Sequence, residues 1–397
     1  MYASRLWSII VFSVLILGTS RCQTPDGPVL SGQIALKAGW RPVLYLVQPR
    51  HFGDIATNYA GVVVDSAVIS PDGRFVFGRF EAPAEPGLYE LVIQPEGSRF
   101  SNKRIDEDPE MSNYLPLILK KGEKIHLRAE ADRLQASAVM ESGSADNGAL
   151  FRLRDVRRQS FDRSLRAPAQ GLADDEALTE QAALLEQYRA PLMDFADTTF
   201  SFWAALVAIR WVSPESDYER VPEFLHRQCR RWQEAGSGHP FAQQLCQPGA
   251  AGKLPVMIGD TIPDVLLPLS DGDTLLLHTL LGKRLTLLDL WASWCAPCRR
   301  ENREVLAPLW AKYRASGFAI VGYALDSSPE AWKSAIRKDA ADWTHASHLG
   351  GDASPFLDTL RITTIPANFL LDADGKIVAK NLHGVALRKF VEEFFKH

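Results

Sequence analysis

Residues 287–298 read LLDLWASWCAPC and join an apolar run to a pair of cysteines. The run Leu285–Trp291 has the length and composition of a buried strand, and a helix is predicted to begin at the cysteines. Cys295 then lies at a helix N-terminus, where unpaired backbone N–H groups and the helix dipole favour the thiolate, the nucleophilic form of cysteine. Two intervening residues let the sulfur of Cys298 close a disulfide with it, and Pro297 suits the first turn of a helix. The stretch therefore predicts a site of thiol-disulfide exchange.

The chain around this stretch alternates between predicted strands and predicted helices. Besides the strand at 285–291, apolar runs predict strands at 318–325, 367–371 and 377–380, and helices at 298–315, 329–339 and 386–395. Because strands that alternate with helices form a sheet covered on both faces, residues 255–397 are predicted to form an α/β domain.

Several motifs of this region occur together in a known family. Besides the strand, acidic residue, Trp and Cys-x-x-Cys, they are 259–264 (GDTIPD), 282–283 (GK), 365–372 (IPANFLLD) and 374–376 (DGK). With them the chain resembles the thioredoxin-like family, in particular exported thiol-disulfide oxidoreductases of the ResA/TlpA type. The resemblance implies a thioredoxin fold, Cys295 as the attacking thiol, Cys298 as the resolving thiol, and a redox disulfide between them. The alternative is a structural disulfide or half of a zinc site, but no second Cys/His pair stands at zinc spacing.

The resemblance also assigns roles to residues around the cysteines. Asp289 would be buried beneath Cys298 and would assist its proton transfer, because an acid inside an apolar run is costly without such a role. The alternative is an Asp at the strand edge that reaches solvent. The substrate groove would be lined by Trp294, Pro297, Ile365 and Pro366, with a cis peptide bond between the last two. An ordinary loop proline and a tryptophan that only packs are the alternatives there.

The chain departs from the family pattern at three points. Where ResA-like proteins often carry a Glu on the preceding strand, this chain has Pro268, so proton transfer would depend on Asp289. Gly322 replaces the lysine that thioredoxins carry on the neighbouring strand. Arg303 stands where the helix after the cysteines often has a kink-forming proline, and Pro308 follows later, so any kink is expected toward the fourth turn.

The first residues, 1–22, have the pattern of a targeting segment. Arg5 precedes an apolar run too short to span a bilayer by itself, and small residues follow it at 18–20. Cleavage after Ser20, lipidation of Cys22 as in a bacterial lipoprotein, and an uncleaved anchor are the alternatives. Each places the rest of the chain outside the cytoplasm, on the periplasmic side of the cell envelope, and the last two attach it to a membrane.

Two regions without a catalytic motif precede the cysteine domain. Residues 25–132 contain short apolar runs separated by turn signals, which predict an antiparallel, β-rich domain, either sandwich-like or an open barrel. It loosely resembles the N-terminal β-domain found ahead of thioredoxin-like domains in Bacteroidetes envelope proteins. Residues 146–250 predict a helical segment, in which 202–212 reads as a buried helix rather than a membrane span. The chain is therefore predicted to be a multidomain protein.

Two features of the helical segment leave alternatives open. Cys229 and Cys246 would form a disulfide or remain two buried thiols, because spacing does not decide the geometry. Six arginines between Arg152 and Arg166 predict a solvated helix face, with contact to an anionic lipid or partner as the alternative.

Composition limits the classes of partner. The chain has 397 residues, a net charge of −4 and a pI of about 6.2, so no nucleic-acid partner is implied. The expected partners are protein thiols and disulfides, together with a membrane thiol carrier as electron donor, and no cofactor or metal is expected. Reduction of partner disulfides is the favoured direction, with oxidation or isomerisation left open. A role in cytochrome c biogenesis is expected, and the alternatives are a thiol-dependent peroxidase or an envelope binding protein with a subsidiary redox domain.

Overall fold

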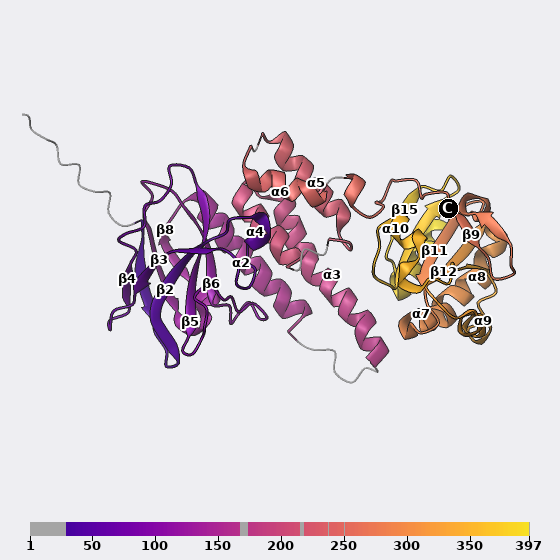
Figure 1. Ribbon diagram of the computed structural model, residues 1–397, viewed down its shortest axis with the longest axis horizontal. Helices are drawn as coiled ribbons and strands as arrows, with labels where there is room; N and C mark the ends of the chain where they lie inside the picture. The colour runs from indigo at the N-terminus through magenta and orange to yellow at the C-terminus, as the bar shows by residue number, and fades with distance from the viewer. Residues whose placement is uncertain (1–28, 167–173, 215–217, 237, 250, 397) are drawn as a thin grey trace, which may run out of the picture.

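The computed structural model describes residues 29–166, 174–214, 218–236, 238–249 and 251–396. The chain forms three successive parts, a β-rich domain, a group of helices and an α/β domain, laid out along the long axis of the molecule (Figure 1). This architecture confirms the predicted fold class. The predicted targeting segment and Cys22 lie outside the described residues. Within the described ranges, no helix combines the length and apolar content that a membrane span needs.

The N-terminal domain consists of two four-stranded sheets packed face to face. Apolar side chains from both sheets, such as Leu30, Leu44 and Leu117, form one buried core between them. The first sheet has the order β4-β1-β7-β8 and the second β3-β2-β5-β6. Their bounds are β1 Leu30–Ala35, β2 Trp40–Gln48, β3 Val62–Val68, β4 Arg74–Val76, β5 Gly87–Pro95, β6 Tyr114–Leu119, β7 Ile125–Glu130 and β8 Val139–Ser142. The sandwich is not purely antiparallel as predicted, because β1 and β7 pair in parallel.

The central helices share a core with the second sheet. They are α2 Ala145–Ser164, α3 Asp174–Thr198, α4 Phe202–Val212, α5 Pro222–Glu234 and α6 Pro240–Gly249, after the short α1 Leu134–Ser137. Helix α4 is almost completely buried, as its uniform apolar sequence predicts. The predicted solvated arginine face is present only in part. Arg152 and Arg163 of α2 are exposed, but Arg157 is buried and forms an ion pair with Asp106 at 2.9 Å. Arg166, just after α2, is exposed and pairs with Asp108 of the β-domain at 2.8 Å.

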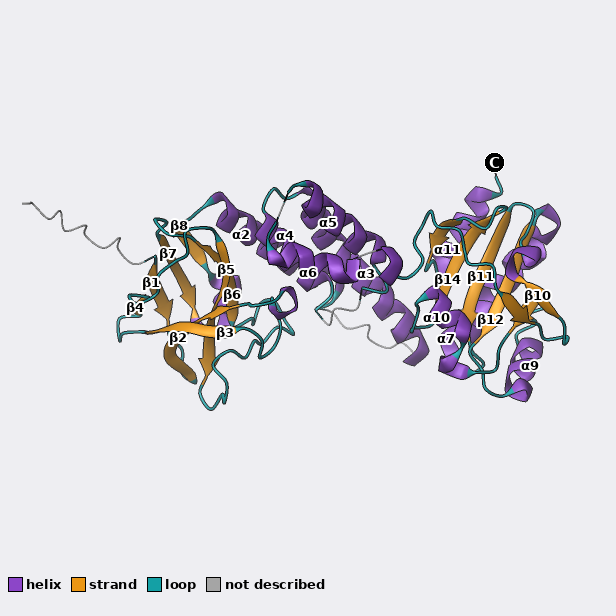
Figure 2. Cartoon of the chain, turned by 45° about the horizontal axis from the view of Figure 1, so that its top comes forward, coloured by secondary structure: helices purple, strands orange, loops and turns teal. Residues whose placement is uncertain are grey.

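The C-terminal domain is a five-stranded mixed sheet with helices on both faces (Figure 2). Its order is β13-β12-β11-β14-β15, so the strand that leads to the cysteines, β11 (Leu285–Trp291), is central. The other strands are β12 Phe318–Ala324, β13 Thr344–Ala346, β14 Ala367–Asp372 and β15 Ile377–Lys380, and a separate hairpin joins β9 Leu266–Pro268 to β10 Thr274–Leu276. The helices are α7 Ala296–Glu301, α8 Ala307–Tyr313, α9 Pro329–Lys338, α10 Pro355–Leu360 and α11 Gly384–Phe394.

The helix after the cysteines is interrupted, where the sequence predicted one helix over 298–315. Helix α7 is followed by a π-helical turn, Asn302–Leu306, and then by α8. Pro308 has no N–H to donate to the carbonyl of Glu304, and Arg388 of α11 donates to that carbonyl instead, at 2.9 Å. The irregular turn thus lies directly before the proline, earlier than the fourth turn.

Candidate active site

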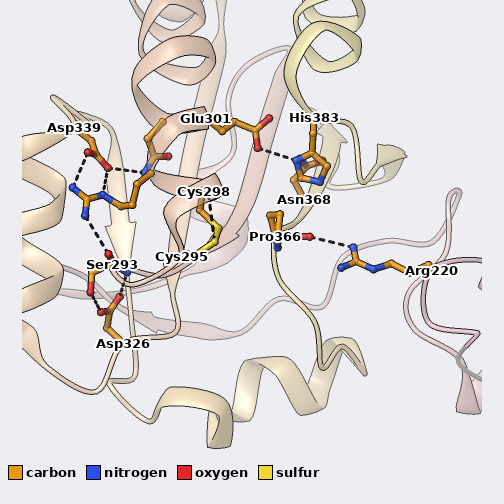
Figure 3. Close-up of a disulfide and its surroundings, with 12 residues drawn as sticks. Arg220, Ser293, Cys295, Cys298, Glu301, Asp326, Asp339, Pro366, Asn368 and His383 are labelled. Carbon is orange, nitrogen blue, oxygen red and sulfur yellow. Dashed lines mark hydrogen bonds and ion pairs between the residues drawn. A yellow bond between two sulfur atoms is a disulfide. The ribbon is translucent and has the colours of Figure 1, made fainter. Parts of the chain in front are cut away.

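The two cysteines lie where β11 ends and α7 begins. Cys295 is the N-cap residue of α7, and its sulfur accepts a hydrogen bond from the backbone N–H of Cys298 at 3.3 Å. A disulfide joins the two side chains, and Pro297 occupies the first helical turn (Figure 3). Because the helix N-terminus directs N–H groups and a positive dipole end at the Cys295 sulfur, this geometry stabilises a thiolate once the disulfide opens.

The loop that carries the cysteines is tethered on its far side. Asp326, which is almost completely buried, accepts hydrogen bonds from the backbone N–H of Ser293 at 2.9 Å and from its hydroxyl. Arg299 donates to the carbonyl of Ser293 at 3.1 Å and also binds Asp339. Trp294 lies between these anchors and Cys295 and is 62% exposed. The loop is therefore fixed while its tryptophan side chain faces solvent.

Asp289 is buried in the middle of β11. Residues alternate between the faces of a strand, so Asp289 shares a face with Leu285 and Leu287, which pack against α8 and α11. The residue is only 4% exposed, and none of the hydrogen bonds among the described residues involves its carboxyl. Burial raises the pKa of Asp289 well above its ordinary value, and the negative charge of Glu301 raises it further. A carboxylate with a raised pKa is a stronger base than an ordinary one, so it can accept a proton from a nearby thiol more readily.

Glu301 is a charged neighbour that the sequence analysis missed. It lies on α7 three residues after Cys298, and its carboxylate faces His383 with 2.8 Å between Oε2 and Nδ1 (Figure 3). The other carboxylate oxygen accepts the backbone N–H of Gly384 at 2.8 Å. The sequence could have indicated Glu301, because it stands one helical turn after Cys298. It could not indicate that His383, 82 residues further along the chain, would be the partner of Glu301.

The Ile365–Pro366 peptide bond is cis and lies just before β14. Figure 3 places Pro366 opposite the disulfide. Its carbonyl accepts a hydrogen bond at 3.1 Å from Arg220, which belongs to the central helical segment. Both the C-terminal domain and the central helical segment therefore border the site.

Comparison with known proteins agrees with this geometry. The family model described as Redoxin matches residues 257–390. The C-terminal domain belongs to the redoxin family. The chain is similar to "Thiol-disulfide oxidoreductase ResA" of Bacillus thuringiensis, with 27% identity over 35% of this chain and 77% of that protein. It is also similar to "Thiol:disulfide interchange protein DsbE" of Allochromatium vinosum, with 28% identity over 34% of this chain and 73% of that protein.

Solved structures from Bacteroides align with the same third of the chain. A thiol-disulfide oxidoreductase from Bacteroides fragilis has 35% identity and a TM-score of 0.32 over 34% of this chain and 98% of that one. The C-terminal domain of a thiol-disulfide oxidoreductase from Bacteroides thetaiotaomicron has 32% identity and a TM-score of 0.33. The alignment covers 35% of this chain and 97% of that one. The Redoxin match and the names of the similar ResA and DsbE proteins indicate an enzyme of the thiol-disulfide oxidoreductase type.

The Cys295–Cys298 disulfide has Pro366 opposite it (Figure 3), whereas Pro268 and the pair Cys229 and Cys246 lie outside this site. Pro268 belongs to the β9–β10 hairpin outside the five-stranded sheet, and the acidic neighbour of Asp289 is Glu301 of α7. Gly322 pairs with Asp289 across β11 and β12. Cys229 and Cys246 form a second disulfide, between α5 and α6. In the described part of the chain, no three His, Cys, Asp or Glu side chains gather as a metal site would require.

Proposed function

We propose that this protein is a thiol-disulfide oxidoreductase of the cell envelope that reduces disulfides of partner proteins through Cys295 and Cys298. The observation that carries the proposal is the Cys295–Cys298 disulfide at the N-terminus of α7, with cis-Pro366 opposite it. The buried Asp289 supports it, because its raised pKa suits a group that exchanges protons with thiols. The names of the similar proteins, thiol-disulfide oxidoreductase and thiol:disulfide interchange protein, support the class of reaction.

The proposed reaction transfers two electrons from the reduced enzyme to the partner. The Cys295 thiolate attacks one sulfur of the partner disulfide, which forms a mixed disulfide and releases the first partner thiolate. Asp289 accepts the proton of Cys298, whose thiolate then attacks the sulfur of Cys295. The Cys295–Cys298 disulfide forms, the second partner thiol leaves reduced, and a membrane thiol carrier would return the enzyme to the dithiol form. Trp294, Pro297, Ile365 and Pro366 would line the groove that holds the partner.

Trapping tests this division of labour. In Cys298→Ser the mixed disulfide on Cys295 cannot be resolved, so partner proteins from envelope extracts should stay covalently attached until a reductant is added. Cys295→Ser is the matched control and should hold none. Equal capture by both variants, or capture by neither, would contradict the proposed roles. The identity of the trapped proteins would also show whether cytochromes c are among the partners.

The envelope location is proposed on the pattern of residues 1–22, with Cys22 as the candidate lipidation site. Metabolic labelling with a radioactive fatty acid should mark the full chain in the membrane fraction, and Cys22→Ser should lose the label. Label retained by Cys22→Ser would exclude lipidation at that cysteine, and full-length protein found in the cytoplasmic fraction would exclude export.

A further inference from the structure

A turn of the central helical segment grips the loop that ends in cis-Pro366. The carboxylate of Glu219 accepts the backbone N–H groups of Thr363 at 2.9 Å and Thr364 at 3.1 Å. It also accepts both threonine hydroxyls, at 2.5 and 2.8 Å. The pKa of Glu219 is lowered by these hydrogen bonds despite the opposing effect of burial, so the ionised form is the one that the loop binds.

The neighbouring residue holds the other end of the same loop. Arg220 donates to the carbonyl of Pro366 at 3.1 Å (Figure 3). Between the two contacts lies Ile365, whose backbone N–H and C=O form no hydrogen bond among the described residues. Glu219 and Arg220 thus secure the loop on both sides of Ile365 and leave the Ile365 peptide groups available next to the cysteines.

The turn itself is anchored in the body of the helical segment. Tyr218 is buried, and its hydroxyl accepts a hydrogen bond from Arg210 of α4 at 3.4 Å. Arg210 is 1% exposed and also donates to the carbonyl of Ile55 in the β-domain at 3.2 Å. Helix α3 of the same segment lies beside α7, the helix that carries Cys298. The helical segment therefore reaches the redox site through fixed contacts.

We propose that Glu219 and Arg220 are positioning residues, a clamp that holds the cis-Pro366 loop ready to pair with an extended polypeptide segment of a protein partner. The inference rests on the proposed thiol-disulfide exchange. It gives the central helical segment, outside the redoxin domain, a part in setting the affinity for protein partners. An extended partner would use the free peptide groups of Ile365 while its disulfide meets Cys295. Because the loop is already ordered, binding would not have to supply the conformational entropy of fixing it. A small disulfide needs no such pairing, so the clamp should not affect it.

The chain offers a matched control at the same domain boundary. Glu223 pairs with Lys380 at 2.8 Å and accepts the backbone N–H of Ile258 at 3.0 Å, so it joins the helical segment to the redoxin domain without contacting the cis-Pro366 loop. Removing Glu223 weakens the domain boundary alone, whereas removing Glu219 also frees the loop.

The experiment compares full-length Glu219→Ala, Glu219→Gln and Glu223→Gln with the unaltered protein. Two substrates are used, insulin with dithiothreitol as reductant and the small disulfide dithiodipyridine. We expect Glu219→Ala to raise KM for insulin about tenfold, the equivalent of about 1.4 kcal/mol, with kcat little changed. Glu219→Gln, which keeps one acceptor oxygen, should raise KM for insulin less than Glu219→Ala does. Glu223→Gln should leave KM unchanged, and all variants should react with dithiodipyridine at the unaltered rate.

Several outcomes would overturn the clamp. An unchanged KM in Glu219→Ala, an equal rise of KM in Glu223→Gln, or an equal loss of rate with dithiodipyridine would each do so. Faster insulin reduction by Glu219→Ala would also overturn it, because the contact would then obstruct partners. If the unaltered protein reacts with neither disulfide, the proposed exchange function fails, which is a result distinct from failure of the clamp.

Discussion

Replacing Asp289 by Asn should make the protein more stable, and increasingly so as pH rises. Asp289 is 4% exposed, its carboxyl forms no hydrogen bond among the described residues, and the negative charge of Glu301 acts on it. Because its pKa is raised in the folded state, the folded protein binds more protons than the unfolded chain above the ordinary value of 3.8. The free energy of unfolding of the unaltered protein is therefore highest at acid pH and falls as pH rises toward the folded pKa of Asp289. Asn does not titrate, so the variant does not lose this stability.

The size of the effect follows from the cost of the buried group. Asn keeps an uncharged polar side chain at this position, so the gain comes only from the ionised form that Asp289 takes at high pH. Each unit by which folding raises a pKa corresponds to about 1.4 kcal/mol of stability that is lost above the folded pKa. We expect Asp289→Asn to gain about 1–3 kcal/mol at about pH 9 and almost nothing at about pH 4. For a domain of this size each kcal/mol shifts Tm by roughly 4 °C. Calorimetry of the disulfide form across this pH range measures the gain.

A control and a second readout separate stability from function. Asp352→Asn removes an exposed carboxylate of the same domain and should show no pH-dependent gain. Asp289→Asn, which keeps Cys298, should resolve the mixed disulfide and release the partner about 100-fold more slowly, with a flattened pH profile, because a general acid-base catalyst usually contributes at least that factor. A Tm difference that does not change with pH, or a variant less stable than the unaltered protein at high pH, would refute the reasoning.

Three further perturbations test other parts of the structure. Arg157→Met should destabilise the N-terminal region by about 3 kcal/mol in guanidinium unfolding, because it leaves Asp106 without its ion-pair partner, and an unchanged midpoint would count against the pair. Replacing Cys229 and Cys246 together by Ala should lower stability by about 3 kcal/mol through the unfolded chain but leave the rate of insulin reduction unchanged, so a parallel loss of rate would be contrary evidence. Burial lowers the pKa of His345 from 6.5 to about 4, so about 3 kcal/mol of stability should be lost as pH falls from 6.5 to 4. Tm measured at several pH values would show this loss. His345→Gln should make Tm depend less on pH in this range, and an unchanged dependence would contradict the role of His345.

The fold and the cysteine site were largely predictable because local sequence determines them. The run Leu285–Trp291 is buried at every position, as a central strand covered on both faces must be. The helix N-terminus at Cys295 follows from the same stretch, and Pro308 indicated that the next helix would be irregular. The π-helical turn lies earlier than predicted, since the missing N–H of a proline affects the preceding turn and Arg388 binds the carbonyl set free there.

The contacts that connect the domains were not predictable, because they join residues far apart in the chain. The arginines between Arg152 and Arg166 predict a solvated helix face, and only the fold shows that Asp106 lies within reach of Arg157. Glu219 stands 144 residues before the threonine it binds, in a stretch with no motif. The parallel pairing of β1 with β7 has the same origin, since an alternating strand pattern does not specify which neighbour a strand takes.

The rate of insulin reduction by the full chain, with dithiothreitol as reductant, tests the central claim most directly. We expect the unaltered protein to accelerate precipitation of the insulin B chain, and Cys295→Ser to fall to the rate of dithiothreitol alone, because no attacking thiolate remains at the N-terminus of α7. Reduction by Cys295→Ser at the rate of the unaltered protein would contradict the assignment of thiol-disulfide exchange to this site.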